Sequence, residues 1–248
     1  MAWQAQAGLP ATGQIDAATR ERLGTTNGVL AQYVVAVEDV NSLTAVPATW
    51  AGKAQMERLG YETVLELVAE KFHAKQALLR RLNPNAPWPN PPAGTTLTVP
   101  DPGAPVVPPA AQVRISLGRK LVRAYDEEGR LIAQFPCSIA RDREKRPVGK
   151  LHVEVVADNP NYLFDPALFV EDPESASIPG KLVIPPGPNN PVGAAWIGLD
   201  RTGYGIHGAP HPEDIGETES HGCFRLANWN ARKLLGMVSI GTPVVVTP

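Results

Sequence analysis

The chain has 248 residues, and 43% of them are hydrophobic, which suffices for one large or two modest packed domains and excludes global disorder. Its 23 Lys and Arg against 25 Asp and Glu give a net charge of −2, which lacks the basic excess typical of nucleic-acid-binding proteins. No run approaches the roughly twenty apolar residues that cross a membrane. Cys137 and Cys223 are too few for a disulfide framework. We therefore expect a globular protein with no nucleic-acid partner and no membrane span.

The N-terminal part predicts a short helical segment followed by a small mixed α and β unit. In residues 1–30, Asp16 is placed to cap a helix over 17–23, but the segment is too short to bury a core of its own. Residues 31–101 then carry apolar runs at strand and helix spacing. They predict a strand, two helices and a strand at 33–37, 63–73, 76–82 and 96–99.

A proline-rich stretch, residues 102–110, separates this unit from a region that is rich in strands. Its prolines favour an extended spacer, so we place a domain boundary there. From 111 to 248, alternating apolar residues and turn signals predict a meander of β-hairpins. One prominent helix is expected over 228–237, with Asn228 as its cap. The Pro- and Asn-rich segment 159–191 has little periodicity, and its length predicts a functional lid or binding rim.

The string GIHGAPHPEDIGETESHGCFRL gathers three of the five histidines and one of the two cysteines. Cys223 precedes the predicted helix, whose positive N-terminal end, together with Arg225, favours the reactive thiolate. Gly222 allows a substrate to approach closely, so that neighbouring backbone amides could hold an oxyanion. His207 could return over the sulfur as a base, with the Gly208 carbonyl orienting its ring. This pattern favours a cysteine nucleophile.

Two other interpretations stay open at this point. A cysteine beside a glycine is often a small buried apolar residue. The second alternative is a zinc site, whose ligands would be His207, His211, His221 and Cys223. The prolines on either side of His211 exclude the helical spacing typical of paired zinc-binding histidines. We expect Cys137 to lie in the core, and His73 and His152 to be ordinary packed or surface residues.

The string ESHGCFRL, with the histidine of IHG sixteen residues before the cysteine, resembles the signature of the L,D-transpeptidase catalytic domain of bacterial cell-wall enzymes. Two further strings agree with the family in order, RPVGKLHV at 146–153 and PPGPNNPVGAAWIGL at 185–199. Arg146 stands where the family usually has threonine. The resemblance covers about residues 111–248. It implies a mainly β, β-sandwich-like catalytic domain with one prominent helix, preceded by the small α+β domain.

The resemblance also implies a role for each residue of the site. Cys223 would be the acyl acceptor, and His207 would act as base and acid. Gly208 would orient His207 through its carbonyl, and backbone amides around Gly222 would form the oxyanion hole. Three neighbours would bind substrate or shape the loop: Arg225, Ser220 and His221. No metal and no cofactor is implied, and the thiolate is expected to react with carbapenems.

Two N-terminal stretches are similar to modules of the same cell-wall context. GYETVLELVAEKFHAKQALLRRLNP followed by AGTTLTVP looks like a LysM domain, a module for glycan strands, with an insertion of about twenty residues before Tyr61. GLPATGQIDAATRERL looks like the second half of a helical peptidoglycan-binding domain. The expected parts are a partial peptidoglycan-binding segment, a LysM-like domain, a linker and a catalytic domain, at 1–30, 31–101, 102–110 and 111–248.

Together these resemblances imply a peptidoglycan L,D-transpeptidase. A donor tetrapeptide stem would acylate the cysteine and release its terminal D-amino acid. An amine of a second stem would then accept the acyl group, giving a 3-3 crosslink. The alternatives are transfer to water, as in an L,D-carboxypeptidase, or to a lipoprotein lysine. A non-catalytic wall-binding protein and a zinc hydrolase are more remote.

The expected partners are peptidoglycan stem peptides and, through the LysM-like domain, glycan strands. Residues 1–4 show no basic and apolar signal-peptide pattern. A location in the periplasm or cell wall of a bacterium is therefore expected from the substrate alone.

Overall fold

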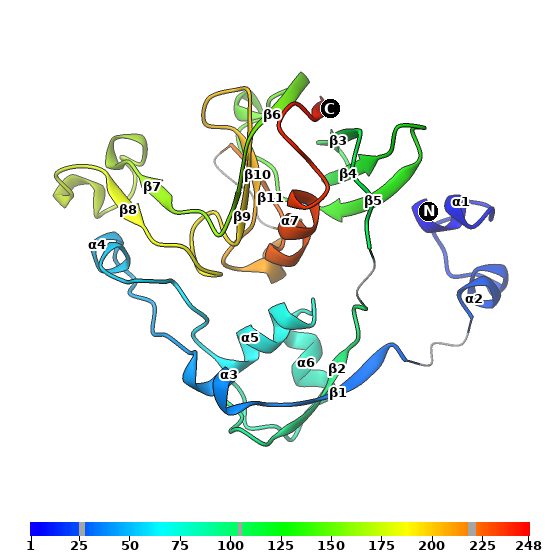
Figure 1. Ribbon diagram of the computed structural model, residues 1–248, viewed down its shortest axis with the longest axis horizontal. Helices are drawn as coiled ribbons and strands as arrows, with labels where there is room; N and C mark the ends of the chain where they lie inside the picture. Colours follow the sequence, from blue (N-terminus) through cyan, green and yellow to red (C-terminus); the bar gives the residue numbers. More distant parts are fainter. Residues whose placement is uncertain (25–27, 104–105, 218–221) are drawn as a thin grey trace.

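The chain folds around one large curled β-sheet, with a smaller α and β unit below it in the view of Figure 1. The computed structural model describes residues 1–24, 28–103, 106–217 and 222–248. Among the helices of these ranges, none has the length and apolar character needed to cross a bilayer.

The large sheet is built from eight strands of the C-terminal part. They are β3 (Gln112–Ser116), β4 (Leu121–Tyr125), β5 (Leu131–Pro136), β6 (Gly149–Asp158), β9 (Ala195–Leu199), β10 (Gly205–His207), β11 (Phe224–Arg225) and β12 (Pro243–Thr247). Their order across the sheet is β11-β10-β9-β6-β12-β3-β4-β5. The pairs β12–β3 and β10–β11 are parallel, and the other neighbours are antiparallel. The predicted fold class, mainly β with few helices, is confirmed.

The core of this sheet follows from the alternation of apolar residues along its strands. Val113 and Ile115 of β3 are fully buried, while Arg114 between them is exposed. Helix α7 (Asn228–Leu235) adds Leu234 to the same core. Cys137 is also buried there, as predicted.

A long connection joins β6 to β9 and contains most of the segment predicted as a lid. It forms a small antiparallel hairpin from β7 (Tyr162–Phe164) and β8 (Leu182–Ile184). Short 3₁₀ turns lie between the two strands, at Pro166–Leu168 and Ser175–Ser177. Two other 3₁₀ turns occur at Arg143–Lys145 and Pro212–Asp214. The hairpin therefore gives local structure to a stretch whose sequence showed little periodicity.

The smaller unit has a strand, helices and a strand in the predicted order. Strands β1 (Leu30–Val34) and β2 (Thr96–Pro100) pair antiparallel. Helices α5 (Val64–Lys71) and α6 (Gln76–Leu82) lie between them in the sequence. The side chain of Thr63 caps α5 by accepting a hydrogen bond from the amide of Glu66, 3.1 Å away. Apolar residues of both helices and both strands form a separate core, which includes Val64, Val68, Leu79, Leu97 and Val99.

The first strand of this unit lies three residues earlier than the sequence predicted. Val35 still makes backbone bonds to Gly94 and Thr95, but helix α3 (Val37–Asn41) begins directly afterwards. The Asp39 carboxylate accepts a bond from the amide of Ala36 at 2.8 Å, which fixes this helix start and ends the strand. A further short helix, α4 (Trp50–Ala54), follows before α5.

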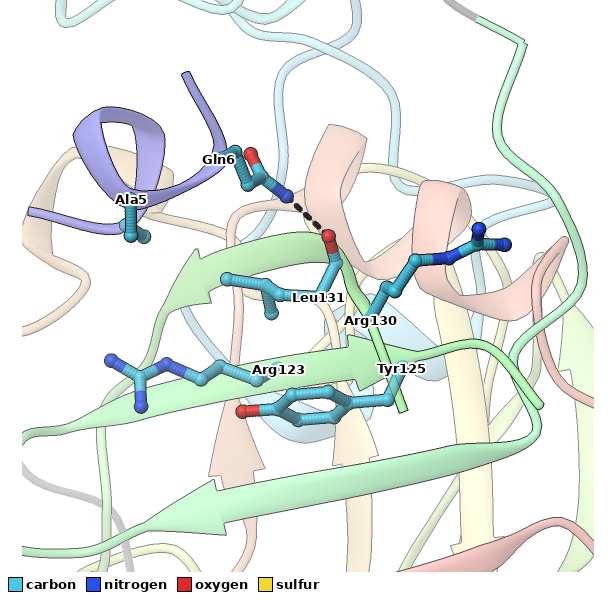
Figure 2. A pocket seen from close by; sticks show the side chains of 7 residues that line it. Ala5, Gln6, Arg123, Tyr125, Arg130 and Leu131 are labelled. Carbon is cyan, nitrogen blue, oxygen red and sulfur yellow. Dashed lines mark hydrogen bonds between the residues drawn. The ribbon is translucent and has the colours of Figure 1, made fainter. Parts of the chain in front are cut away.

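The N-terminal segment contacts the large sheet. It consists of α1 (Ala2–Gln6) and α2 (Ala17–Leu23), and Asp16 caps α2 as predicted, 2.8 Å from the amide of Thr19. The side-chain amide of Gln6 donates to the carbonyl of Leu131 in β5 (Figure 2). An open pocket of about 410 Å³ lies between α1 and strands β4 and β5.

The smaller unit is packed against the large sheet through several specific contacts. His73, after α5, stacks on Trp229 of α7 with ring centroids 5.4 Å apart. The backbone amide of Leu59 donates to the carbonyl of Pro186 at 2.9 Å. The amide of Asn189 donates to the carbonyl of Gly60 at 2.8 Å. The predicted domain boundaries stay predictions, but the two cores are joined by these contacts as well as by the chain.

Candidate active site

His207 ends β10, and Cys223 directly precedes β11, the strand that pairs with β10 in parallel. Ile206 is in register with Phe224, and His207 with Arg225. Ile206 and Phe224 are buried in the core, so their neighbours in sequence point to the opposite face of the sheet. Cys223 and His207 therefore share one face, with α-carbons about 8 Å apart from strand geometry alone. That spacing allows an imidazole and a thiol to meet.

The side chain of His207 is held in one orientation. It is 5% exposed, and its Nδ1 lies 2.6 Å from the carbonyl oxygen of Gly208. Because a carbonyl can only accept, Nδ1 carries the proton when the ring is neutral, and Nε2 holds the free lone pair. Burial lowers the pKa of His207 to about 4; the Gly208 bond opposes this and the charge of Arg225 adds to it. The ring is therefore a neutral proton acceptor at ordinary pH.

Trp196 forms the wall against which this histidine packs. It lies opposite His207 in the β9–β10 register, and the two rings stack with centroids 5.6 Å apart. A Cβ at position 205 would lie 2.6 Å from the indole, so Gly205 makes room for the ring. Trp196 stands in one of the strings that resemble the family, but its contact with His207 follows from the strand register and not from the local sequence.

The thiol of Cys223 is protonated at rest. Its Sγ donates to the carbonyl of Gly203 at 3.4 Å. Burial raises the pKa of Cys223 to about 11, although the backbone of Gly205 and the charge of Arg225 lower it. The prediction of a thiolate stabilised by the helix was wrong. Strand β11 separates Cys223 from helix α7, which begins five residues later, and a helix dipole acts only near its first turn.

Arg225 lies beside the thiol on the same face of the sheet. Its backbone amide donates to the carbonyl of Ser138 at 3.0 Å, and its carbonyl accepts from the amide of Ser138 at 2.9 Å. Its half-buried guanidinium interacts electrostatically with Cys223 and Asp214. Among the described residues, a Cβ at position 222 would meet the Tyr204 ring at 3.9 Å.

Two of the predicted site residues, Ser220 and His221, lie outside the described residues. Among the residues that the structure describes, no three His, Cys, Asp or Glu side chains gather as a metal site.

Asn228 has a different role from the one predicted. Ala227 is the N-cap of α7, and the buried side chain of Asn228 bonds to distant backbone instead. Its Oδ1 accepts hydrogen bonds from the amides of Ala194 and Ala209, each at 3.0 Å. Side chains at the preceding positions 193 and 208 would lie 2.1 Å from this oxygen, so both must be glycine. Asn228 thus fixes the backbone that carries the Gly208 carbonyl behind His207.

Glu70 of α5, in the smaller unit, makes a hydrogen bond with the side chain of Asn228. The Nδ2 of Asn228 donates to the Glu70 carboxylate and, at 3.2 Å, to the carbonyl of Pro188. Burial raises the pKa of Glu70 to about 7, while the bond from Asn228 lowers it. Glu70 lies 158 residues from Asn228 in the sequence, which explains why sequence patterns did not reveal it.

Tyr162, at the start of the hairpin in the predicted lid segment, interacts electrostatically with the Cys223 thiol. Burial, with a smaller contribution from Cys223, raises the pKa of Tyr162 to about 12. The register agrees with this placement: Asp158 pairs with Ala195, one position from the Trp196–His207 pair, so the connection leaves the sheet at the histidine end. The segment was predicted from its length and composition, but no sequence pattern marks this tyrosine.

Comparison with known families decides the class of this site. Residues 110–246 match the L,D-transpeptidase catalytic domain, the YkuD family. The chain belongs to this family. The match contains every site residue described above except Glu70.

Individual relatives of this L,D-transpeptidase domain carry related names. The putative L,D-transpeptidase YkuD of Bacillus licheniformis is 27% identical over 184 residues, 74% of this chain and 93% of that protein. The putative L,D-transpeptidase YqjB of Bacillus subtilis is 35% identical over 106 residues, and the chain spans only 51% of its length. An L,D-transpeptidase structure from Mycobacterium smegmatis aligns with a TM-score of 0.42 at 23% identity, covering 62% of this chain and 64% of that one.

Removing the Asn228 amide is expected to damage both the L,D-transpeptidase fold and its site. Asn228→Ala leaves the buried amides of Ala194 and Ala209 and the buried Glu70 without this partner. Each loss of this kind is worth about 1–3 kcal/mol, so we expect unfolding free energy to fall by about 3 kcal/mol or more. Urea denaturation measures this. Asn230→Ala, on the same helix but only partly buried, is the control and should change stability by less than about 0.5 kcal/mol. Equal stability of the two variants would contradict the assignment.

Proposed function

We propose that the chain is a peptidoglycan L,D-transpeptidase in which Cys223 is the nucleophile and His207 the general base. The observation that supports the proposal is the register of β10 and β11: with strand alternation it favours Cys223 and His207 on one face, and the bond to Gly208 leaves the free lone pair of His207 on Nε2. The matched family supplies the reaction class. The neutral state of both groups supports proton transfer during attack rather than a resting ion pair.

The first half of the reaction forms a thioester. Nε2 of His207 takes the thiol proton as Sγ bonds to the carbonyl carbon of the third, L-configured centre of the donor tetrapeptide stem. Backbone amides at Gly222 and Cys223 hold the resulting oxyanion. When the tetrahedral intermediate collapses, the C–N bond to the terminal D-amino acid breaks, and His207 returns its proton to the leaving amine.

The second half transfers the acyl group to an acceptor. His207 removes a proton from the side-chain amine of a second stem as that nitrogen attacks the thioester carbon. The C–S bond then breaks, the thiolate recovers its proton, and a 3-3 crosslink results. Arg225 is placed to attract a substrate carboxylate, and we assign Ser220 and His221 to the shape of the adjoining loop. The chain's own residues supply every proton transfer of this scheme.

The N-terminal part is proposed to bring the enzyme to its polymer. The antiparallel pair β1–β2, with helices α5 and α6 between its strands in the sequence, supports a LysM-like domain for glycan strands at 31–101, and the short helices of 1–30 support a partial peptidoglycan-binding segment. The family's cell-wall substrate supports a location in the bacterial periplasm or cell wall. With boundaries near 31, 102 and 111, the catalytic domain would occupy the rest of the chain.

Product analysis tests the proposed acceptor. The full chain is incubated with disaccharide-tetrapeptides, and the products are separated by mass. We expect dimers with a 3-3 crosslink and release of the terminal D-amino acid. Tripeptides without dimers would instead mean an L,D-carboxypeptidase. If the stem is transferred only when a lipoprotein-derived lysine peptide is added as acceptor, the chain would be a wall-anchoring transferase.

A further inference from the structure

The connection between β1 and α5 holds the additional residues that set this unit apart from the modules it resembles. It includes helix α4, which lies beside strand β8 of the hairpin in Figure 1. Its apolar residues join the hairpin in a third core, whose fully buried members are Leu59, Phe164 and Ile184. The connection therefore packs on the catalytic domain rather than only on its own unit.

Trp50 makes the central contacts of this third core. Its ring stacks on Phe164 with centroids 4.1 Å apart and lies 6.2 Å from the ring of Tyr162. Its indole Nε1 donates to the Asp172 carboxylate at 2.8 Å, and its backbone amide donates to Glu174 at 2.9 Å. One residue of the N-terminal unit thus touches β7 and the turn between the two strands.

A second anchor lies at the other end of the connection. The backbone of Leu59 bonds to Pro186 at 2.9 Å and to Asn189 at 3.2 Å. A Cβ at position 187 would lie 2.0 Å from the carbonyl oxygen of Leu59, so Gly187 is required for this approach. The chain leaving β8 is therefore held against Leu59 before it enters β9.

The hairpin itself is short, and its described packing lies in the third core. Each strand has three residues, and an isolated two-stranded hairpin is marginally stable at best. Leu163 and Val183, opposite each other in the register, are 55% and 57% exposed. In the described part of the chain, the other face of the hairpin is the packed one, and the Trp50 core covers it.

We propose that Trp50 is a positioning residue, through which the N-terminal unit holds the β7–β8 hairpin beside Cys223 and limits the access of water to the thioester. This inference rests on the proposed function. Tyr162 connects the two sites: its ring lies 6.2 Å from that of Trp50, it follows the end of β6 that pairs beside Trp196 and His207, and its phenol interacts electrostatically with Cys223. Water excluded from the thioester cannot compete with the acceptor amine.

The test compares four full-length single variants and the double variant Trp50→Phe/Asp172→Ala. Trp50→Ala removes the whole contact, Trp50→Phe keeps an aromatic ring but loses the indole donor, and Asp172→Ala removes its acceptor. Gln55→Ala, an exposed change just after α4, is the matched control. Two quantities are measured: hydrogen exchange of the amides of residues 162–184, and the ratio of hydrolysis to transfer with disaccharide-tetrapeptide as donor and acceptor.

We expect Trp50→Ala to raise both the hairpin exchange rate and the hydrolysis-to-transfer ratio by about tenfold, the equivalent of one lost hydrogen bond to a charged group. Trp50→Phe and Asp172→Ala should each give a smaller rise, and the double variant should add nothing beyond the larger of the two. Gln55→Ala should match the wild type in both measurements.

Two results would overturn the inference. Unchanged hairpin exchange in Trp50→Ala would mean that Trp50 does not hold the hairpin. Faster exchange with an unchanged product ratio would mean that the hairpin does not control water. A wild type that forms no thioester contradicts the proposed function instead, and in that case hydrogen exchange alone decides whether Trp50 positions the hairpin.

Discussion

Replacing His207 with alanine is expected to slow thioester formation by about a thousandfold at pH 7. The reason lies in the thiol. With its pKa raised by burial to about 11, only on the order of one Cys223 in 10⁴ is ionised at pH 7. Attack at a useful rate therefore needs a base within reach, and His207 is the buried acceptor on the same face of the sheet.

The pH dependence gives this prediction a second signature. Burial lowers the pKa of His207 to about 4, so the ring is neutral and competent above that value and becomes protonated only below it. The wild-type rate should therefore stay level from about pH 5 to 9 and fall as the pH drops through about 4. In His207→Ala the rate should rise about tenfold per pH unit across the same range, because only the thiolate then reacts.

The rate of adduct formation with a carbapenem, followed by mass spectrometry from pH 4 to 9, checks both expectations. His152→Ala is the control. His152 lies on β6 rather than on β10, is about half exposed, and has its Nδ1 2.8 Å from the carboxylate of Asp200. A wild-type rate in His207→Ala, or a level pH profile in that variant, would contradict the role of His207 as the base.

The local pattern of the sequence accounts for many of the strands and helices and for the two residues of the proposed nucleophile–base pair. Alternating apolar residues predict the strands of the large sheet, because each strand buries one face. His207 and Cys223 stand in short glycine-containing strings whose chemistry is visible without neighbours. Helix 76–82 and the cap at Asp16 follow from equally local rules. These are features that a few adjacent residues determine.

What the sequence did not reveal depends on contacts between distant segments. Glu70 and Trp50 act on residues more than a hundred positions away, and no periodicity marks such pairs. Asn228 is of a residue type that is common at helix caps. Its side chain instead makes hydrogen bonds to two other loops, at Ala194 and Ala209. The expectation for the Cys223 thiolate was wrong because burial outweighs the helix dipole once a strand lies between them.

Replacing Cys223 is expected to have the largest effect of all. Cys223→Ala should abolish both the thioester and every product derived from it, since no other described thiol can take its place. Cys137 is fully buried, and burial raises its pKa to about 12, so it is inert toward an electrophile in solution. Cys137→Ala should therefore keep the activity while losing some stability through a small cavity in the core.

Intact mass after incubation with a carbapenem tests the central claim most directly. Wild type, Cys223→Ala and Cys137→Ala are treated together, folding is verified by circular dichroism, and the modified peptide is mapped. The account predicts one drug added to the wild type and to Cys137→Ala, located on Cys223, and no addition to Cys223→Ala. An adduct that persists in Cys223→Ala, or its absence from folded wild type, would contradict a nucleophilic Cys223.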